Sequence, residues 1–477
     1  MENYGEILKS SRGGDVLLFG GYMYNLNRLS EDTYYWECKY RNKTKKEVAS
    51  CSARLNSRLR DNRHLVCSTV KDHTHAPDTS EVDKVRLRME LKRITASDSG
   101  PPSRVRRVAA IGLPDSVQVK LSASAQRKII QRARPAIASV QYRDGVFLIP
   151  EELQRTLNGD VFYRGTVEVE GGKALLFVAN TEIERLCEAR FWISDGTFDT
   201  VPGEFHQLVT IHASIAPDHA RTIPAVYALL TNKTQALYAA MLQKVSEVAA
   251  EMEVDLNPPM ILTDFEKGLI NAFHEEFPEA NQVGCYFHFT QSLWRKIQTM
   301  GLVPLFAGDA NLSRSFKKLR ALPFVPENHI PEAFEIIKSA APSSMAGFML
   351  YIEETYVLGR KKTPKSKSRH SPLFKPKFWS VHENVKEDLP RTSNCVESWH
   401  NGWAIVVGVS HGSTGRIVRE IQLEQKTAAG RVQAILAGAQ GEVQNDVKDK
   451  NADLKRIVMK FSDYKLADFI DTITNVL

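Results

Sequence analysis

The chain has 477 residues, of which 43% are hydrophobic and 25% charged, a composition typical of folded domains with substantial cores. Its net charge of +7 permits polyanion binding without requiring it. Six scattered cysteines are too few for a disulfide scaffold, no apolar run approaches the ~18 residues that cross a bilayer, and no secretory signal is visible, so we expect a soluble intracellular protein.

The first part of the chain is predicted to be rich in short β-strands. Residues 14 to 78 contain segments such as DVLLFGGYMY and DTYYWECKY, separated by clusters of Asn, Gly and Asp. Residues 80 to 135 indicate basic helices, DKVRLRMELKRI and SAQRKIIQRAR, around the breaker SDSGPPSR. Lys84 to Arg134 contains thirteen Lys/Arg and three acids. On charge alone, a solvated linker is an equally good interpretation of this run.

From about residue 160 the pattern becomes α/β. A hairpin, FYRGTVEVEGGKALLFVAN, precedes three tandem strands in ARFWISDGTF, FHQLVTIHASI and TIPAVYALLTN, and the helix TQALYAAMLQKVSEVAAEM follows. Next come the strand PPMILTD, a helix with apolar residues Phe265, Leu269, Phe273 and Phe277 on one face, and a strand NQVGCYFHF. This order predicts a mixed sheet covered by helices, which suits a ribonuclease H-like core, although periodicity alone does not single that fold out.

The rest of the chain is predicted to be mostly helical. Residues 300 to 360 combine helical stretches with Pro breaks. A loop from Arg360 to Lys377 contains eight Lys/Arg and no acid. The segment RTSNCVESWHNGWAIVVG indicates one more helix, and a helical C-terminal tail follows it.

Two cysteines and two histidines in the β-rich region have the chemistry of metal ligands. Cys38, Cys51, His73 and His75 follow the spacing C-x12-C-x21-H-x-H. Zinc favours two thiolates and two imidazoles in a tetrahedron, and a module of ~65 residues with few aliphatic core residues needs such a crosslink. The spacing alone does not exclude two semi-buried cysteines and two loop histidines. We expect Cys67 in the core rather than among the ligands.

The residues around this set form a more specific pattern. Two aromatic residues and a Trp precede the first cysteine in YYWECKY, C-x-A-R marks the second in SCSARLNSR, and a proline follows H-x-H in DHTHAPD. Over residues 14 to 78 the chain therefore resembles a FLYWCH-type zinc finger, although Glu37 separates the Trp from the cysteine. The resemblance implies a structural Zn²⁺ and DNA binding. The expected phosphate contacts are Arg41, Lys43, Lys45, Lys46, Arg54 and Arg58.

Three acidic residues are candidates for a metal-dependent active site. Asp195 follows an apolar strand in WISDGTFDTVP, Asp264 ends the buried strand PPMILTD, and Glu397 lies on the predicted helix in RTSNCVESWHNGW. Phosphodiester cleavage by two divalent cations needs carboxylates held on rigid strand ends and on a facing helix. The three acids have positions that such a site requires.

Each acid also has a purely structural interpretation. Asp195 could belong to an Asp-Gly turn. Asp264 could cap the following helix, where Thr263 and Glu266 already suggest a capping box. The third acid could complete a similar box with Asn394, and for that residue the pattern alone favours the box. None of the three would be assigned to catalysis from its own surroundings.

Taken together, the segments resemble a known family. DGTFDTVP, HQLVTIHA, IPAVYALLTNKTQALY, ILTDFEKGLINAF, GCYFHFTQSLWRKI and RTSNCVESWHNGW occur in the order of the Mutator-like (MULE) transposase domain, over about residues 185 to 415. The resemblance implies that Asp195, Asp264 and Glu397 form a DDE triad that holds two Mg²⁺ or Mn²⁺ ions, with a helical insertion before the glutamate. It also implies an active-site role for His288 in a Cys-x-x-His element with Cys285.

These observations predict the following architecture. The fold class is α/β, a ribonuclease H-like DDE core with an all-helical insertion, preceded by a small β-rich zinc-binding domain. The expected limits are 10–80 for the zinc finger, 81–160 for a basic helical DNA-binding region, 161–300 for the first part of the core, 301–388 for the insertion with its basic loop 360–377, 389–420 for the last part of the core, and 421–477 for a helical tail.

The leading functional hypothesis is a DNA transposase that binds transposon ends and performs metal-dependent cleavage and strand transfer. Its expected partners are double-stranded DNA, as terminal and target sequences, and further copies of the chain; no membrane is expected, and the nucleus is the expected location. The alternative is a domesticated transposase acting as a non-catalytic DNA-binding regulator. The presence of all three acids argues against this alternative, although recent domestication would leave them intact. A general ribonuclease H-like nuclease would explain the core but not the finger.

Overall fold

The chain forms two compact units, Met1–Ala136 and Ile137–Leu477, which we call the N-terminal unit and the C-terminal unit. No helix in the described stretches is both long and apolar enough to span a bilayer. The limits of individual domains within the units stay predictions from the sequence. The computed structural model describes residues 3–10, 14–41, 50–97, 102–111, 121–133, 139–198, 200–215, 221–306, 308–408, 412–437 and 445–477.

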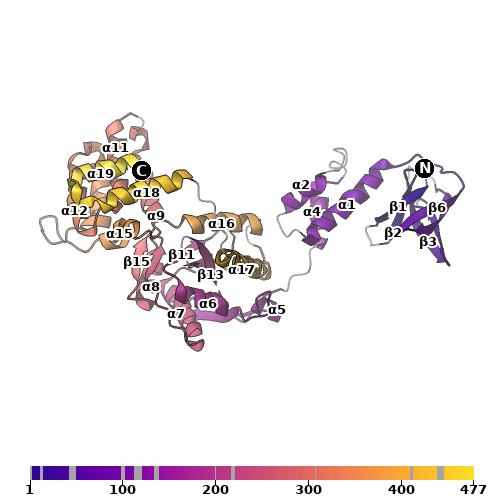
Figure 1. Ribbon diagram of the computed structural model, residues 1–477, viewed down its shortest axis with the longest axis horizontal. Coiled ribbons are helices and arrows are strands. Elements are labelled where there is room, and N and C mark those ends of the chain that lie inside the picture. Colours follow the sequence, from indigo (N-terminus) through magenta and orange to yellow (C-terminus); the bar gives the residue numbers. More distant parts are fainter. Residues whose placement is uncertain are drawn as a thin grey trace. The chain divides into compact units, whose positions relative to one another are not determined.

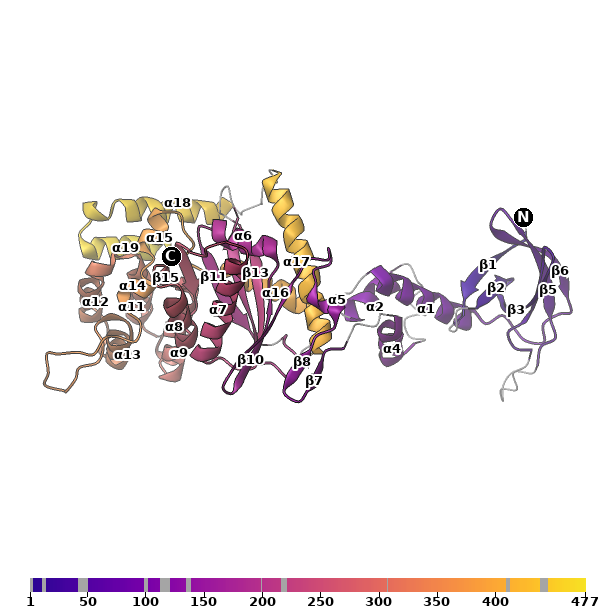
Figure 2. The same cartoon turned by 90° about the horizontal axis from the view of Figure 1, so that it is seen from below.

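Six strands in the N-terminal unit close into an antiparallel barrel (Figure 2). Consecutive strands pair along the barrel, and Tyr4 in the first strand pairs with Leu65 in the last. Gly20 and Gly21 connect the second and third strands with φ angles of 57° and 80°, which a two-residue hairpin turn of this kind requires. The strands are β1 (Tyr4–Lys9), β2 (Asp15–Phe19), β3 (Tyr22–Ser30), β4 (Thr33–Cys38), β5 (Arg54–Arg60) and β6 (Arg63–Val70).

The barrel encloses a small core around Trp36. The indole Nε1 of Trp36 donates a hydrogen bond of 2.8 Å to Ser57 Oγ, so its one polar atom is satisfied. The prediction that Cys67 lies in the core is wrong, because Val66 points inward on β6 and the next side chain therefore points to solvent. The buried residues of this core are Leu17, Tyr24, Trp36, Leu55 and Val66.

Three helices follow the barrel: α1 (Thr79–Ser97), α2 (Pro102–Ala110) and α4 (Ala123–Ala133). The first and the third are the basic helices expected from the sequence, whereas α2 was not expected and begins at Pro102, inside the segment SDSGPPSR that was predicted to be a break. Val82 and Val85 of α1 pack against β-barrel residues, which joins the helices to the barrel. Further along, α1 shares a second core with α2 and α4. That core contains Leu87, Leu91, Ile94, Val105, Ala109, Leu121 and Ile130.

The C-terminal unit is built on a seven-stranded mixed sheet with the order β15-β14-β11-β12-β13-β10-β9. The hairpin and the three tandem strands are antiparallel, whereas β14 runs parallel to both β11 and β15. A small strand pair, β7 (Gln141–Arg143) and β8 (Val146–Leu148), precedes the sheet. The sheet strands are β9 (Tyr163–Val169), β10 (Gly172–Phe177), β11 (Trp192–Thr197), β12 (Gln207–Ser214), β13 (Thr222–Leu230), β14 (Met260–Thr263) and β15 (Asn281–Gly284).

Helices cover both faces of this sheet (Figures 1 and 2). One face packs against α6 (Asn180–Glu188), α7 (Gln235–Glu251) and α8 (Lys267–Glu276). The other packs against α5 (Glu151–Gln154), α16 (Asn394–Val407) and α17 (Thr414–Leu436). Alternation along β11 turns Trp192 toward the first face and Ile193 toward the second. Asp195, two residues after Ile193, therefore shares its face.

The remaining helices form a lobe at the β15 edge, which we call the helical lobe (Figure 2). The C-terminal helices α18 and α19 pack into this lobe rather than extending from the molecule as a free tail. Tyr286 N donates a hydrogen bond of 2.8 Å to Arg391 O, so the two ends of the segment from residue 286 to residue 391 lie side by side. The α-helices of the lobe are α9 (Tyr286–Thr299), α10 (Val303–Phe306), α11 (Ala310–Ala321), α12 (Ile330–Ser339), α13 (Ala346–Ile352), α14 (Pro376–Trp379), α15 (His382–Lys386), α18 (Asn445–Met459) and α19 (Leu466–Val476).

The sequence-based prediction of one strand over NQVGCYFHF is wrong in its second half. Strand β15 ends at Gly284, and α9 begins at Tyr286. Tyr286 and Phe289 of this run belong to the buried face of the helix, which Leu293 continues at helical spacing, whereas Phe287 is exposed. A short apolar run fits a strand or a buried helix equally well, and the helical continuation decides the outcome here.

Candidate metal centres

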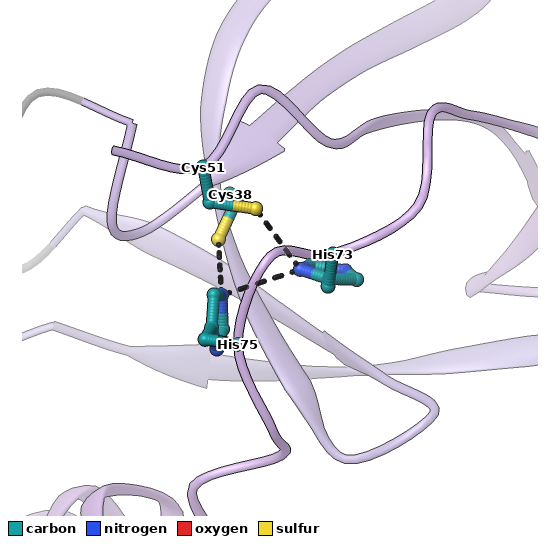
Figure 3. Close-up of side chains that lie close together, drawn as sticks. All are labelled: Cys38, Cys51, His73 and His75. Carbon is teal, nitrogen blue, oxygen red and sulfur yellow. Dashed lines mark hydrogen bonds between the residues drawn. The ribbon is translucent and has the colours of Figure 1, made fainter. Parts of the chain in front are cut away.

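The four predicted zinc ligands meet at one end of the barrel (Figure 3). Cys38 is the last residue of β4, Cys51 precedes β5, and both histidines follow β6. Cys38 Sγ lies 3.2 Å from His75 Nε2, and Cys51 Sγ lies 3.4 Å from His73 Nδ1. The two histidine nitrogens, His73 Nδ1 and His75 Nε2, are 3.3 Å apart. The structure therefore brings together all four side chains that the sequence predicts as ligands.

These separations fit a tetrahedral zinc site. Zn–N bonds of about 2.0–2.1 Å and Zn–S bonds of about 2.3 Å give tetrahedral edges of roughly 3.3–3.8 Å between ligand atoms. All four ligand atoms lie within 4.8 Å of one another, and both cysteines are buried. Two thiols and two imidazoles are the donor set that zinc favours in structural sites.

The second nitrogen of each histidine has a partner that fixes the ring. His73 Nε2 donates to the hydroxyl of Tyr24 over 2.7 Å when Nδ1 faces the site, and His75 Nδ1 donates to Ala76 O over 2.9 Å. Tyr22 stacks on His73 with ring centroids 3.6 Å apart. Metal-binding histidines usually have such a partner, which selects the tautomer and orients the ring. The surroundings of both rings are therefore those of metal ligands.

The two thiols have different electrostatic surroundings. Burial raises the pKa of Cys38 to about 11. Burial also acts to raise the pKa of Cys51, but hydrogen bonds from the backbone of Thr74 and Ala53 outweigh it and leave that pKa below its ordinary value. Cys51 is thus the thiol that ionises first. A cation at this site would stabilise both thiolates, and zinc binding would release the proton of Cys38.

In the C-terminal unit, strand register aligns the two predicted catalytic aspartates. Ile193 of β11 pairs with Leu262 of the parallel strand β14. Two residues further along both strands are Asp195 and Asp264. Neighbouring strands lie about 4.7–4.9 Å apart, so the two aspartates begin from adjacent backbone positions at one end of the sheet.

Helix α16 carries Glu397 and His400 toward the face of the sheet that holds Asp195. Glu397 Oε1 lies 3.9 Å from His288 Nε2, and His400 Nδ1 lies 3.9 Å from Asp195 Oδ2. Among the described residues, Glu397 Oε1 and His400 Nε2 are buried without a hydrogen-bond partner. Buried polar atoms without a hydrogen-bond partner indicate a ligand-binding site, and both atoms belong to the group formed by Asp195, His288, Glu397 and His400.

The pKa values of Asp195 and His288 depend on the other charged side chains of this group. Burial raises the pKa of Asp195 to about 6; His288 opposes the rise, and Asp264 and Glu397 add to it. Burial acts to lower the pKa of His288, but Cys285, Asp195 and Asp264 outweigh it and raise that pKa to about 9. His288 is therefore a cation among the acids at neutral pH. The surplus of negative charge that remains favours further cations.

The carboxylate group is more open than the cysteine and histidine group. In the stretches the structure describes, only the latter set has three or more possible ligand atoms within 4.8 Å of one another. Two cations about 3.5–4 Å apart would spread their ligands over a wider region than a single zinc ion does. Among the described residues, the acids therefore do not form a compact site for a single ion.

The structural interpretations hold only for Asp264, whose Oδ1 accepts a hydrogen bond of 3.0 Å from Glu266 N just before α8. Asp195 lies within β11 and not in a turn. Thr263 and Glu266 form no capping box, because the hydroxyl of Tyr238 donates to Glu266 Oε1 over 2.8 Å and the helix begins after Glu266. On α16 the N-cap is Ser393 and has no side-chain cap, so no box forms at the start of this helix.

Two contacts near the acids were missed in the sequence. Cys285 Sγ accepts a hydrogen bond of 3.3 Å from Ser393 N, which ties the end of β15 to the start of the helix that carries Glu397. Glu266 lies half-buried near Asp264, and burial together with Asp264 raises its pKa. The sequence shows Cys285 only as part of a Cys-x-x-His element, and the fold brings it to Ser393, 108 residues later.

Comparison with known families identifies two domains. Residues 7–75 match the FLYWCH zinc finger domain, and residues 191–292 match the MULE transposase domain. Both resemblances drawn from the sequence are thereby confirmed. The second match contains Asp195, Asp264 and His288 and ends before Glu397. A comparison with curated proteins found no match.

We expect the N-terminal unit to bind one zinc ion per chain, since one complete ligand set is present among its described residues. Replacing a ligand, in Cys51→Ser, should abolish zinc binding and unfold the barrel, because its small core depends on the crosslink. Metal analysis and circular dichroism of a fragment spanning residues 1–136 measure both effects.

Cys67→Ser is the matched control for this experiment. Cys67 is exposed on β6 and outside the ligand set, so its replacement should leave the zinc content and the fold unchanged. Zinc retained after Cys51→Ser, or lost after Cys67→Ser, would show that the ligand set is assigned incorrectly.

Proposed function

We propose that the chain is a DNA transposase of the Mutator-like type, which binds transposon ends and performs metal-dependent phosphodiester cleavage and strand transfer. The observation that carries the proposal is the presence of a FLYWCH zinc finger match and a MULE transposase match in one chain. The first accounts for DNA recognition and the second for chemistry on DNA. The nucleus is the compartment that this function implies.

The sheet topology supports a ribonuclease H-like core. Three tandem antiparallel strands, β11 to β13, are followed by helix α7, strand β14, helix α8 and strand β15. This is the order that the sequence suggested for such a core. The two aspartates lie at one end of neighbouring parallel strands, and α16 supplies a third carboxylate from the covering layer.

In this proposal Asp195, Asp264 and Glu397 would together hold two Mg²⁺ or Mn²⁺ ions. Such ions, when bound, activate the attacking oxygen and stabilise the leaving oxygen of the phosphodiester. The buried Oε1 of Glu397, which has no hydrogen-bond partner, supports this role. So does the raised pKa of Asp195, because crowded carboxylates become stable anions when cations lie between them.

His288 has a complementary part in this proposal. Its imidazole is cationic at neutral pH and lies 3.9 Å from Glu397. It would orient the Glu397 carboxylate and attract a DNA phosphate to the acids. Its place in the first turn of α9 fixes it close to the end of β15, so it moves with the sheet rather than with a loop.

DNA recognition is assigned to the N-terminal unit. Arg54 and Arg58 are exposed on β5, and Arg41 forms an ion pair with Glu37 over 3.2 Å. The other predicted phosphate contacts, Lys43, Lys45 and Lys46, lie outside the described residues. Exposed arginines on a barrel strand can contact the DNA backbone and set the orientation of the module. Cutting and joining two transposon ends also implies more than one copy of the chain.

The catalytic assignment predicts that Asp195→Asn, Asp264→Asn and Glu397→Gln each reduce strand cleavage at least about 100-fold, because a lost ligand misplaces the reacting groups. Stability should change little. Asn at position 264 can still accept the hydrogen bond of 3.0 Å that Glu266 N donates to Asp264 Oδ1. Cleavage assays with Mg²⁺ and thermal unfolding of the same proteins measure the two effects.

Glu275→Gln, an exposed acid on the neighbouring helix α8, is the matched control and should cleave like the wild type. Full cleavage by any of the three site variants would disprove the triad. A wild-type protein that binds transposon ends but never cleaves them, under varied metals, would instead identify a domesticated DNA-binding regulator.

We also expect removal of residues 1–136 to abolish selective binding to transposon ends, because the finger and the basic helices lie in this unit. Binding by the full chain should weaken steeply with salt, since each neutralised phosphate adds roughly 0.9 to the slope of log affinity against log salt. Competition between terminal and unrelated duplexes measures selectivity. Equal selectivity in the shortened protein would refute the assignment of recognition to this unit.

A further inference from the structure

The basic loop predicted from the sequence is an ordered hairpin, which we call the basic hairpin (residues 359–372). Lys362 N donates to Ser368 O over 3.0 Å, and His370 N donates to Arg360 O over 2.8 Å. Lys361 and Arg369 form an antiparallel bridge between its two arms. Figure 2 shows this segment extending from the helical lobe beside α13. It is therefore a defined projection and not only a charged linker.

A buried ionic cluster anchors the base of the hairpin. Arg369 donates to Glu353 Oε1 over 2.5 Å and to Gly359 O over 2.8 Å, and Lys338 of α12 donates to Glu353 Oε2 over 2.5 Å. The Glu353 side chain is only 6% exposed. A buried carboxylate needs paired cations, so Arg369 is held in place and the arm of the hairpin that carries it is held as well.

The backbone at the base is equally constrained. Glu353 O accepts hydrogen bonds from both Leu358 N and Gly359 N at the end of a π-helical turn, over 2.8 and 3.0 Å. Gly359 has a φ of 80°, and a Cβ atom there would lie 1.9 Å from His370 O. Only glycine allows the two arms to approach this closely.

The hairpin is also tied to the catalytic end of the sheet. Phe374, just after the hairpin, stacks on Tyr356 and packs edge-to-face on Phe265, with ring centroids 5.6 and 4.9 Å apart. Phe265 is the residue that follows Asp264. We expected Phe265 on the apolar face of α8, but it precedes that helix and packs into the helical lobe instead. An aromatic cluster thus joins the hairpin to the backbone beside a proposed catalytic acid.

The exposed side chains of the hairpin are almost all cationic or polar. No acid occurs from residue 360 to residue 377. Within the described part of the chain, the lysines of the hairpin have no ion-pair partner, whereas its one inward-facing cation, Arg369, is paired with Glu353. The unpaired, exposed cations are Arg360, Lys361, Lys362, Lys365 and Lys367.

We propose that the basic hairpin binds the phosphate backbone of double-stranded DNA and holds the duplex at a fixed place relative to the carboxylates. The inference rests on the proposed function and adds a second DNA contact, in the C-terminal unit, that is independent of the finger. Charge complementarity identifies the partner as a polyanion. Because the base of the hairpin is already ordered, binding costs little conformational entropy. Phosphate contacts of this kind position DNA without reading its sequence.

The test measures binding of the full-length chain to a 30-base-pair duplex without transposon ends, by fluorescence anisotropy across a salt series and without added divalent metal. The hairpin variant replaces Lys361, Lys362, Lys365 and Lys367 with Gln. Its slope of log affinity against log salt should be less steep by about 2 to 4, since each lost phosphate contact removes roughly 0.9. All four side chains are exposed, so the fold should be unaffected.

A matched variant separates the hairpin from net charge. Replacing Lys317, Lys426, Lys460 and Lys465 with Gln removes the same charge from exposed positions elsewhere in the C-terminal unit and should leave the slope unchanged. Gly359→Ala keeps every charge but displaces the arms, and it should weaken duplex binding without lowering the unfolding temperature of the N-terminal unit.

The result of this experiment does not depend on whether the protein cleaves DNA, because only DNA binding is measured. Failure of this proposal can therefore be told apart from failure of the proposed function. A hairpin variant that binds the duplex with the wild-type slope would overturn the proposal, as would an equal loss in the matched variant. Loss of affinity for a single-stranded RNA of equal length, with duplex binding intact, would also overturn it and would point to RNA as the ligand.

Discussion

The parallel register between β11 and β14 is the constraint on which the C-terminal unit depends. Pairing Ile193 with Leu262 brings two aspartates that are 69 positions apart in sequence to one end of the sheet. A shift of β11 by one residue would turn Asp195 toward α7 and α8 and put Ser194 in its place, because strand side chains alternate between faces. The apolar core on both faces fixes this register, so the packing of the sheet also determines the geometry of the acids.

The two candidate metal centres are stabilised in opposite ways. In the barrel, the enclosed core is small, and the cysteine and histidine ligands supply a crosslink that the core cannot replace. In the C-terminal unit, extensive cores on both sheet faces fix the strands and the helix that carry the acids. Metal would be a condition of folding in the first centre and a condition of chemistry in the second. The two roles call for different ligands: soft thiolates for a permanent ion and carboxylates for exchangeable ones.

The sequence predicted most elements of the fold, because buried strands and amphipathic helices leave clear periodic patterns. It failed where distant contacts override local patterns. The box expected from Thr263 and Glu266 does not form because Tyr238, on another helix, takes the Glu266 carboxylate. The apolar run after Gly284 continues as a helix, since its residues fill the core of the helical lobe. Cys67 faces solvent because side chains alternate between the two faces of β6, and this alternation, rather than the apolar character of cysteine, determines where the side chain lies.

The candidate ligands could be proposed from sequence because Cys, His, Asp and Glu carry their chemistry visibly. The distances between these side chains could not be predicted from the sequence, and neither could the buried ion pair that holds the base of the basic hairpin. Glu353 and Arg369 are ordinary charged residues in the sequence, and only the fold pairs them in a buried position. The family resemblance suggested the three acids as a set, whereas strand pairing explains why the two aspartates, so far apart in the chain, lie at one end of the sheet.

The hydrogen bond between Tyr286 N and Arg391 O allows the segment between these two residues to vary in length. This segment begins and ends at one point beside the sheet, so its length is decoupled from the distance between the acids. Helices could be gained or lost in the lobe without stretching the connection to Glu397. The lobe is therefore the part of the C-terminal unit that is free to diversify, and it is also the part that carries the basic hairpin. New DNA contacts could arise there while the acids keep their positions.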